Sequence, residues 1–152
     1  MIMTKRIYVA GPLFSDSERA YLESMVDALA DGLGLDPIKD IFLPHRDAGD
    51  AGVDMMSDVF DADVDAVLSA EIIVAWLDGI TVDPGTAVEI GMGYSNGVIV
   101  FGLLTDRRSN ETNMNNMIRF SCTHICHSLG EVCDRVAARL SKRAEKDSVG
   151  GE

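Results

Sequence analysis

Hydrophobic side chains follow two patterns along the chain: short continuous runs, and longer stretches in which they recur every three or four residues. The continuous runs predict strands buried on both faces, and the spaced stretches predict amphipathic helices. The runs occupy residues 7–10, 41–43, 72–77 and 98–104, and the spaced stretches occupy 16–33, 54–69, 84–96 and a segment from residue 129. Strands and helices thus alternate as βαβαβαβ, followed by a closing helix.

This order predicts an α/β fold: a single-domain, doubly wound parallel sheet of the flavodoxin or Rossmann-like kind, with helices on both faces. The 152 residues leave room for one domain. We expect this domain to span residues 1–142 and a polar, flexible tail to span 143–152. Ligands of such sheets bind beyond the carboxyl ends of the strands, so we expect the site in the loops that follow them.

Local signals define several boundaries. Ser15 with Glu18, and Ser128 with Glu131, have the spacing of capping boxes, and Asp83 before a proline is typical of a helix N-cap. The stretches 45–52 and 105–116 read as loops, and 117–125 as a possible last strand. The apolar residues expected on the inner face of the second helix are Met56, Val59, Phe60, Val64, Val67 and Leu68.

Charge narrows the range of partners. The chain carries 25 acidic and 13 basic residues, a net charge of −12, which would repel nucleic acid and anionic membranes. The longest apolar run is too short to span a membrane, and no signal peptide is evident, so we expect a cytoplasmic protein. A surface rich in acid and poor in lysine fits either a high-salt (halophilic) adaptation or an ordinary acidic protein.

A compact group of potential ligands lies near the C-terminus: Cys122, His124, Cys126 and His127. Structural zinc sites normally combine two such groups separated by a longer loop, and the sequence has no second group. We therefore expect no metal here, and no disulfide framework from three cysteines. The simpler interpretation is that these residues pack near the core.

Glu89 is the most informative residue, because most other residues of its predicted helix are either apolar or glycines without a side chain. Gly85 and Gly93 lie four residues to either side and so share its face. Each interior glycine costs about 1 kcal/mol of helix propensity, which indicates that bare backbone is needed there. A ligand could then approach the carboxylate closely. The alternative is a surface glutamate on a helix packed against the sheet.

Three other side chains could join Glu89. Asp83 lies six residues earlier, and two carboxylates flanking an anomeric carbon can cleave a glycosidic bond. Asp63 interrupts an apolar stripe, where it either needs buried polar partners or reaches water at the edge of the stripe. Tyr8 is central in the first strand. Either its hydroxyl makes a hydrogen bond in a site, or its ring is simply buried in the core.

With these residues in place, the sequence resembles the nucleoside 2-deoxyribosyltransferase family. Ile7–Phe14 is similar to the opening segment of that family, Leu77–Gly79 with Asp83–Gly91 to its central signature, and Asn115–Met117 to its late Asn-x-Met element. Asp63 matches a helical Asp/Asn position. The similarity covers about residues 6–120. Trp76 departs from it, because relatives often carry a small polar residue there.

The resemblance implies catalytic roles for three residues: Glu89 as the nucleophile at C1′, Asp83 in proton transfer to the leaving base, and Tyr8 in orienting Glu89. It implies a substrate-binding role for Asp63 toward the sugar hydroxyls. The other substrate-binding positions that follow from it are Gly11, Phe14, Asp78, Gly85, Asn115 and Met117. Asn115 and Met117 would reach the site of a neighbouring subunit, which implies a homo-oligomer.

The expected activity is exchange of the base of 2′-deoxyribonucleosides in nucleoside salvage, with free nucleobases as second substrates and no cofactor. One alternative is an N-glycosidase that hydrolyses 2′-deoxynucleoside 5′-monophosphates. The turn at 11–15 argues against that alternative, because it contains a proline and bulky apolar residues, and the next arginine along the chain is Arg19. The other alternative is a non-catalytic nucleotide-binding module.

Overall fold

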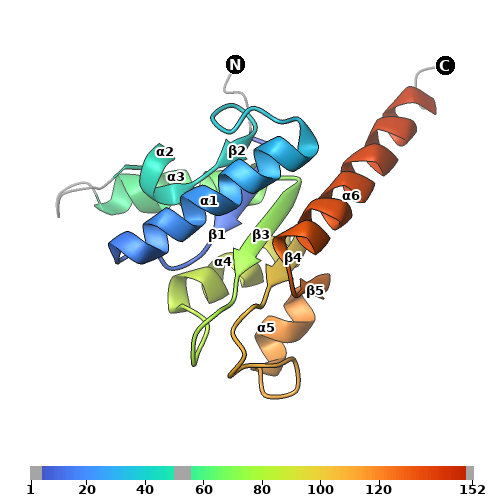
Figure 1. Ribbon diagram of the computed structural model, residues 1–152. Coiled ribbons are helices and arrows are strands. Elements are labelled where there is room, and N and C mark those ends of the chain that lie inside the picture. Colours follow the sequence, from blue (N-terminus) through green and yellow to red (C-terminus); the bar gives the residue numbers. More distant parts are fainter. Residues whose placement is uncertain (1–4, 50–55, 150–152) are drawn as a thin grey trace.

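One parallel sheet organises the computed structural model, which describes residues 5–49 and 56–149. Within these residues the spatial order of the five strands is β2-β1-β3-β4-β5, and all pairings are parallel (Figure 1). The strands are β1 (Ile7–Ala10), β2 (Ile41–Phe42), β3 (Ile72–Trp76), β4 (Ile99–Leu103) and β5 (His124–Cys126). This order is that of flavodoxin-like doubly wound sheets, so the predicted fold class is confirmed.

Helices cover both faces of the sheet. The longer elements are α1 (Asp16–Leu33) and α6 (Leu129–Val149) on one face, and α3 (Met56–Ser69), α4 (Pro84–Ser95) and α5 (Asn116–Ser121) on the other. Alternation along each strand divides the core accordingly. In β1, Ile7 and Val9 pack toward α1 and α6, whereas Tyr8 and Ala10 pack toward α3 and α4.

Two of the three predicted helix caps form in full. The Ser15 and Glu18 pair makes a complete capping box at α1, and the Asp83 side chain accepts from the Thr86 backbone at the start of α4. At α6 only half of the box forms. Ser128 Oγ accepts from the Glu131 N–H at 3.1 Å, but the Glu131 carboxylate bonds to residues of the preceding strand and turn.

Three segments differ from the sequence prediction. The predicted loop at 45–52 begins with a one-turn helix, α2 (Pro44–Asp47), and residues 50–52 lie outside the described part of the chain. The segment 117–125 is not one strand, because its first half is helix α5, capped by Asn115. Helix α6 continues to Val149, seven residues beyond the predicted domain end, since good helix formers fill this stretch.

The predicted inner face of α3 is correct for only some of its six residues. Val67 is buried, and Val59 and Val64 are half-buried. Met56 and Phe60 are 63% exposed, and Leu68 is 44% exposed. The apolar pattern of α3 is therefore wider than the surface with which α3 packs inside one chain. Among the described residues, no helix combines the length and the apolar character needed to cross a membrane.

Candidate active site

A hydrogen bond between β1 and α4 lies at the centre of the candidate site. The Tyr8 hydroxyl donates to Glu89 Oε1 at 2.7 Å. Tyr8 is fully buried, and its ring stacks on Phe42 with centroids 5.4 Å apart. The hydroxyl therefore has a fixed position. Of the two interpretations of Tyr8, the one in which its hydroxyl makes a hydrogen bond agrees with the structure.

Glycine brings α4 close enough to the sheet for this contact. A Cβ at Gly93 would lie 2.3 Å from Ile73 Cδ1, on the strand beside Tyr8. Gly93 therefore serves helix packing, and the expectation that it leaves room for a ligand is wrong. Gly85 differs, because it is exposed and a Cβ there would approach only Asp83 Oδ2, at 3.2 Å.

Three carboxylates influence one another at this point. Burial raises the pKa of Glu89 to about 8, while the Tyr8 hydrogen bond lowers that pKa, and the charges of Asp63 and Asp83 raise it further. Burial also raises the pKa of Tyr8 far above its usual range, so its hydroxyl remains a donor. The structure thus places all three predicted acids close to the Tyr8 hydroxyl or to one another.

Asp63 carries an unsatisfied acceptor in this cluster. Its Oδ1 atom is buried and has no hydrogen-bond partner among the described residues. Burial raises the pKa of Asp63 to about 6. A buried acceptor without a partner costs about 1–3 kcal/mol, and a ligand hydroxyl at this position would remove that cost. The sequence left two interpretations of Asp63 open. The structure supports a partly buried side chain and not one that simply reaches water.

Asp83 is held by a residue that sequence reasoning passed over. Its Oδ2 accepts from the Thr86 backbone N–H at 2.8 Å and from the Thr86 hydroxyl at 3.0 Å. Thr86 is 1% exposed. A hydroxyl residue three positions after an N-cap aspartate is the signal that could have identified it. Both bonds fix the Asp83 carboxylate at the start of α4.

Two predicted binding residues have structural contacts of their own. Asp78 accepts from the backbone N–H groups of Thr105 and Asp106, at 2.5 and 2.9 Å, and so joins the loops that follow β3 and β4. A Cβ at Gly11 would lie 2.7 Å from Leu22 Cδ2, so a side chain there would collide with α1. Phe14, by contrast, is 77% exposed.

A cleft of about 610 Å³ lies between the loops that follow β3 and β4. Asn115 and Val82 line it, and Asp83 follows Val82 directly, so the cleft adjoins the start of α4. Tyr8 and Glu89 do not line it. Met117 is 79% exposed. Glu89, the carboxylate that the Tyr8 hydroxyl orients, is half-buried and lies outside the lining of this cleft.

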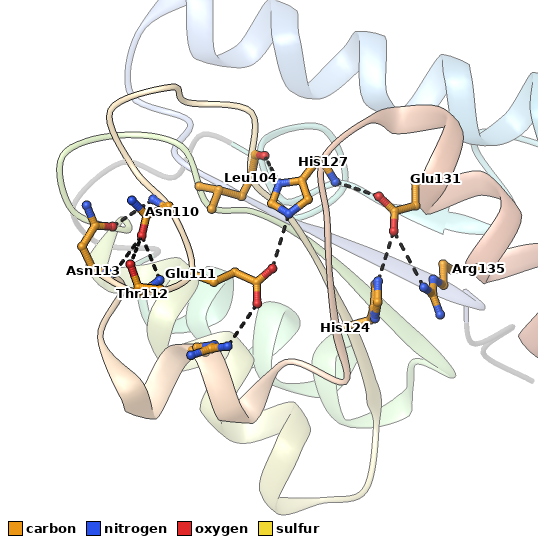
Figure 2. A network of polar contacts seen from close by, with 10 residues as sticks. Leu104, Asn110, Glu111, Thr112, Asn113, His124, His127, Glu131 and Arg135 are labelled. Atoms are coloured by element: carbon orange, nitrogen blue, oxygen red, sulfur yellow. Dashed lines mark hydrogen bonds and ion pairs between the residues drawn. The ribbon is translucent and has the colours of Figure 1, made fainter.

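The C-terminal group of cysteines and histidines is divided by the fold. Cys122 packs on the α4 face of the sheet and Cys126 on the α6 face. The His127 ring points to the loop after β4, where Nδ1 donates to the Leu104 carbonyl at 3.1 Å and Nε2 lies 3.4 Å from Glu111 (Figure 2). His124 and Cys126 remain together and are joined by Glu131.

Comparison with protein families fits this geometry. The model of the family described as nucleoside 2-deoxyribosyltransferase matches residues 7–122. The chain belongs to this family. Every site residue predicted above lies inside the matched segment. Family membership indicates an enzyme that acts on nucleosides as small-molecule substrates. A comparison with curated proteins gives no match.

Solved structures agree with the fold. A conserved protein from Enterococcus faecalis V583 is 27% identical, with 90% of this chain and 99% of that chain covered and a TM-score of 0.72. A 2-deoxyribosyltransferase from Bacillus psychrosaccharolyticus is 23% identical, with 84% and 90% covered and a TM-score of 0.69. The CMP N-glycosidase BcmB from Clostridium botulinum is 20% identical, with 87% and 98% covered and a TM-score of 0.54.

Proposed function

We propose that this protein exchanges the base of 2′-deoxyribonucleosides through a covalent deoxyribosyl ester on Glu89. The observation that carries the proposal is the 2.7 Å hydrogen bond from the buried Tyr8 hydroxyl to Glu89. It orients one carboxylate oxygen and leaves the other as a nucleophile, with Asp83 nearby for proton transfer. Family membership and the fold shared with the B. psychrosaccharolyticus enzyme support this reaction.

The proposed exchange has two steps. Glu89 attacks C1′, the bond from C1′ to the base nitrogen breaks, and the bonding pair leaves with the base, whose protonation Asp83 assists. The nitrogen of a second base then attacks C1′, releases the Glu89 carboxylate and gives up a proton. Asp63 would accept a hydrogen bond from a sugar hydroxyl, which suits its unsatisfied Oδ1.

The same chemistry favours deoxyribosides over ribosides. Both steps pass through transition states that resemble an oxocarbenium ion, and an electron-withdrawing 2′-hydroxyl destabilises such a cation. Nucleophilic carboxylate chemistry of this kind requires no metal and no organic cofactor.

We also propose that the active enzyme is a homo-oligomer whose sites include Asn115 and Met117 from a neighbouring chain. Asn115 is exposed and Met117 is 79% exposed, so both are accessible to a second subunit. The apolar residues Met56 and Phe60 of α3 are exposed as well. Large exposed apolar side chains are typical of surfaces that another chain covers.

One observation favours the hydrolase as a second candidate. Arg19 lies outside the turn at 11–15 in sequence, but its Nε donates to the Leu13 carbonyl at 2.7 Å. The fold therefore brings a guanidinium to the turn after β1, where a 5′-phosphate could be recognised. The fold likeness to the N-glycosidase BcmB is consistent with this candidate.

One chromatographic experiment separates these functions. The protein is incubated with deoxyinosine and adenine, and separately with deoxyinosine 5′-monophosphate, with Glu89→Ala as the control. Deoxyadenosine formed only by the unsubstituted protein supports the transferase, and a deoxyribosyl adduct on Glu89, detected by mass spectrometry, supports the mechanism. Hypoxanthine released from the monophosphate without exchange supports the hydrolase. Binding without turnover of either substrate identifies a non-catalytic module.

A further inference from the structure

Three metal-ligating side chains converge where β5 meets α6. His124 and Cys126 are two residues apart on β5 and so project to the same side of the strand. Glu131 reaches His124 from the first turn of α6 (Figure 2), and Cys126 belongs to the same group of ligand atoms. One ligand atom from each residue lies within 4.8 Å of the others, and His124 Nε2 is 3.1 Å from Glu131 Oε1.

The local fold fixes this arrangement. The Glu131 carboxylate accepts from the His127 backbone N–H at 3.0 Å, which holds it over the turn between β5 and α6. Ser128 caps the same turn of the helix by accepting from the Glu131 N–H. Cys126 is fully buried against the α6 side of the sheet. The three ligands therefore come from a strand and a helix that are both anchored in the core.

We propose that His124, Cys126 and Glu131 bind a divalent transition metal ion of the zinc class. Imidazole nitrogen, thiolate and carboxylate are all ligands of such ions. Tetrahedral zinc sets neighbouring ligand atoms about 3.4–3.8 Å apart, so closing the cluster requires a movement of about 1 Å. The His124 side chain is 36% exposed and can make that movement while Glu131 keeps its place over the turn.

Charge and access are compatible with the site. On binding, the Cys126 thiol releases its proton to solvent and its sulfur forms a bond to the metal, so thiolate and carboxylate together balance a divalent ion. Arg135 Nη2 lies 3.8 Å from Glu131 Oε1, but this side chain is 46% exposed and can turn toward water. The exposed sides of His124 and Glu131 give the ion a path from solvent and leave a fourth position for water.

The site is separate from the proposed reaction. Cys126 packs on the α6 face of the sheet, whereas Tyr8 packs on the opposite face. A bound ion would fasten the edge strand β5 to α6. The sequence has no second group of cysteines and histidines, and Glu131 was expected only as a capping residue. The fold supplies this carboxylate as the third ligand.

Cobalt titration of tag-free, chelator-treated protein under reducing conditions tests the proposal. The unsubstituted protein should bind one Co²⁺ per chain with a near-ultraviolet charge-transfer band from the cobalt–thiolate bond, and Zn²⁺ should abolish that band. Cys126→Ser should lose the band, whereas Cys122→Ser and Cys133→Ser should keep it. His124→Gln and Glu131→Gln should each weaken zinc binding at least about tenfold in calorimetry.

Two results would overturn the proposal: no charge-transfer band in the unsubstituted protein, or a band that persists in Cys126→Ser. If Cys126→Ser does not fold, the partly exposed His124 keeps the test decisive. Zinc should then raise the melting temperature of the unsubstituted protein more than that of His124→Gln, and an equal rise in both would exclude this site. None of these measurements depends on base exchange, so this proposal and the proposed function fail independently.

Discussion

At Glu89, burial and a hydrogen bond act on the charge of one carboxylate in opposite directions. Burial disfavours the charged form and raises the pKa to about 8, while the Tyr8 hydroxyl stabilises the charged form and lowers it. The charge on Asp63 raises the pKa again. The proposed nucleophile must be charged to attack, so under that proposal these neighbours determine how much of the protein is active at a given pH.

The pH dependence of kcat/KM should therefore shift in opposite directions in two variants. The unsubstituted enzyme should become more active as pH rises through the pKa of Glu89. Tyr8→Phe removes an interaction that lowers this pKa, so the rise should occur at higher pH. Asp63→Asn removes a charge that raises it, so the rise should occur at lower pH.

The measurement is base exchange followed between about pH 5 and pH 10. Both variants should also have lower maximal activity, because Tyr8 orients Glu89 and Asp63 would bind the sugar. The midpoint of the profile, and not the maximal rate, is therefore the relevant quantity. Midpoints that coincide in all three proteins would show that these two residues do not set the charge of Glu89.

The sequence predicted the acids of the site better than their environment. Glu89 was identified because the rest of its helix is apolar or glycine, and Asp63 because it interrupts an apolar stripe. The structure places both near the Tyr8 hydroxyl. The role of Thr86 and the convergence of Glu131 on Cys126 were missed. Both depend on contacts that form only after the chain folds, and a local pattern of residues does not contain them.

At the scale of one helix, the glycines of α4 divide into two kinds. A Cβ at Gly93 would lie 2.3 Å from Ile73 Cδ1, inside a fully buried region of the sheet, whereas a Cβ at Gly91 would meet nothing within 4 Å. Alanine gains helix propensity equally at both positions, by about 1 kcal/mol. Only the alanine at Gly93 forces Ile73 out of its packed position, which typically costs about 1–3 kcal/mol.

Gly93→Ala should therefore unfold at lower denaturant concentration than Gly91→Ala, by a free-energy difference of about 1–3 kcal/mol. Gly91→Ala should be slightly more stable than the unsubstituted protein. Gly93→Ala should also lose exchange activity, because α4 carries Glu89 and would move from Tyr8. Equal stability of the two variants would show that the sheet accommodates the extra methyl group without strain.

Hydrophobic periodicity predicted the larger elements and failed at the short ones. Segments such as Ile72–Trp76 and Asp16–Leu33 are long enough to show one period clearly. Between residues 116 and 126 a helix of six residues is followed by a strand of three, and neither is long enough for its period to be recognised. The end of α6 is exposed, so its polar sequence has no hydrophobic period from which a helix to Val149 could be predicted.

At the scale of the whole molecule, the net charge of −12 creates repulsion among carboxylates. If this surface is an adaptation to high salt, the melting temperature should rise as salt increases from low to molar concentration, because salt screens that repulsion. Screening also weakens the exposed ion pairs, but such pairs contribute only about 0–1 kcal/mol each. A melting temperature that stays constant or falls in both sodium and potassium chloride would contradict the adaptation.

The exposed apolar residues of α3 show a limit of sequence patterns at this scale. Met56 and Phe60 belong to a helical stripe that predicts an inner face, yet both are 63% exposed in the single chain. A stripe of this kind has the same appearance whether the sheet or a second subunit covers it. The position of α3 could therefore be predicted, but whether another surface covers Met56 and Phe60 could not.

The proposed shared site can be tested in oligomers that contain two different inactive variants. Asn115→Ala and Glu89→Ala should each be nearly inactive alone, because each removes one contribution to every site. In an equal mixture under subunit exchange, some sites combine Asn115 from one chain with Glu89 from another. Random pairing should restore about a quarter of the activity if each site uses one neighbour. Differently tagged chains confirm that exchange takes place, and confirmed exchange without recovered activity would show that Asn115 does not complete the site of a neighbour.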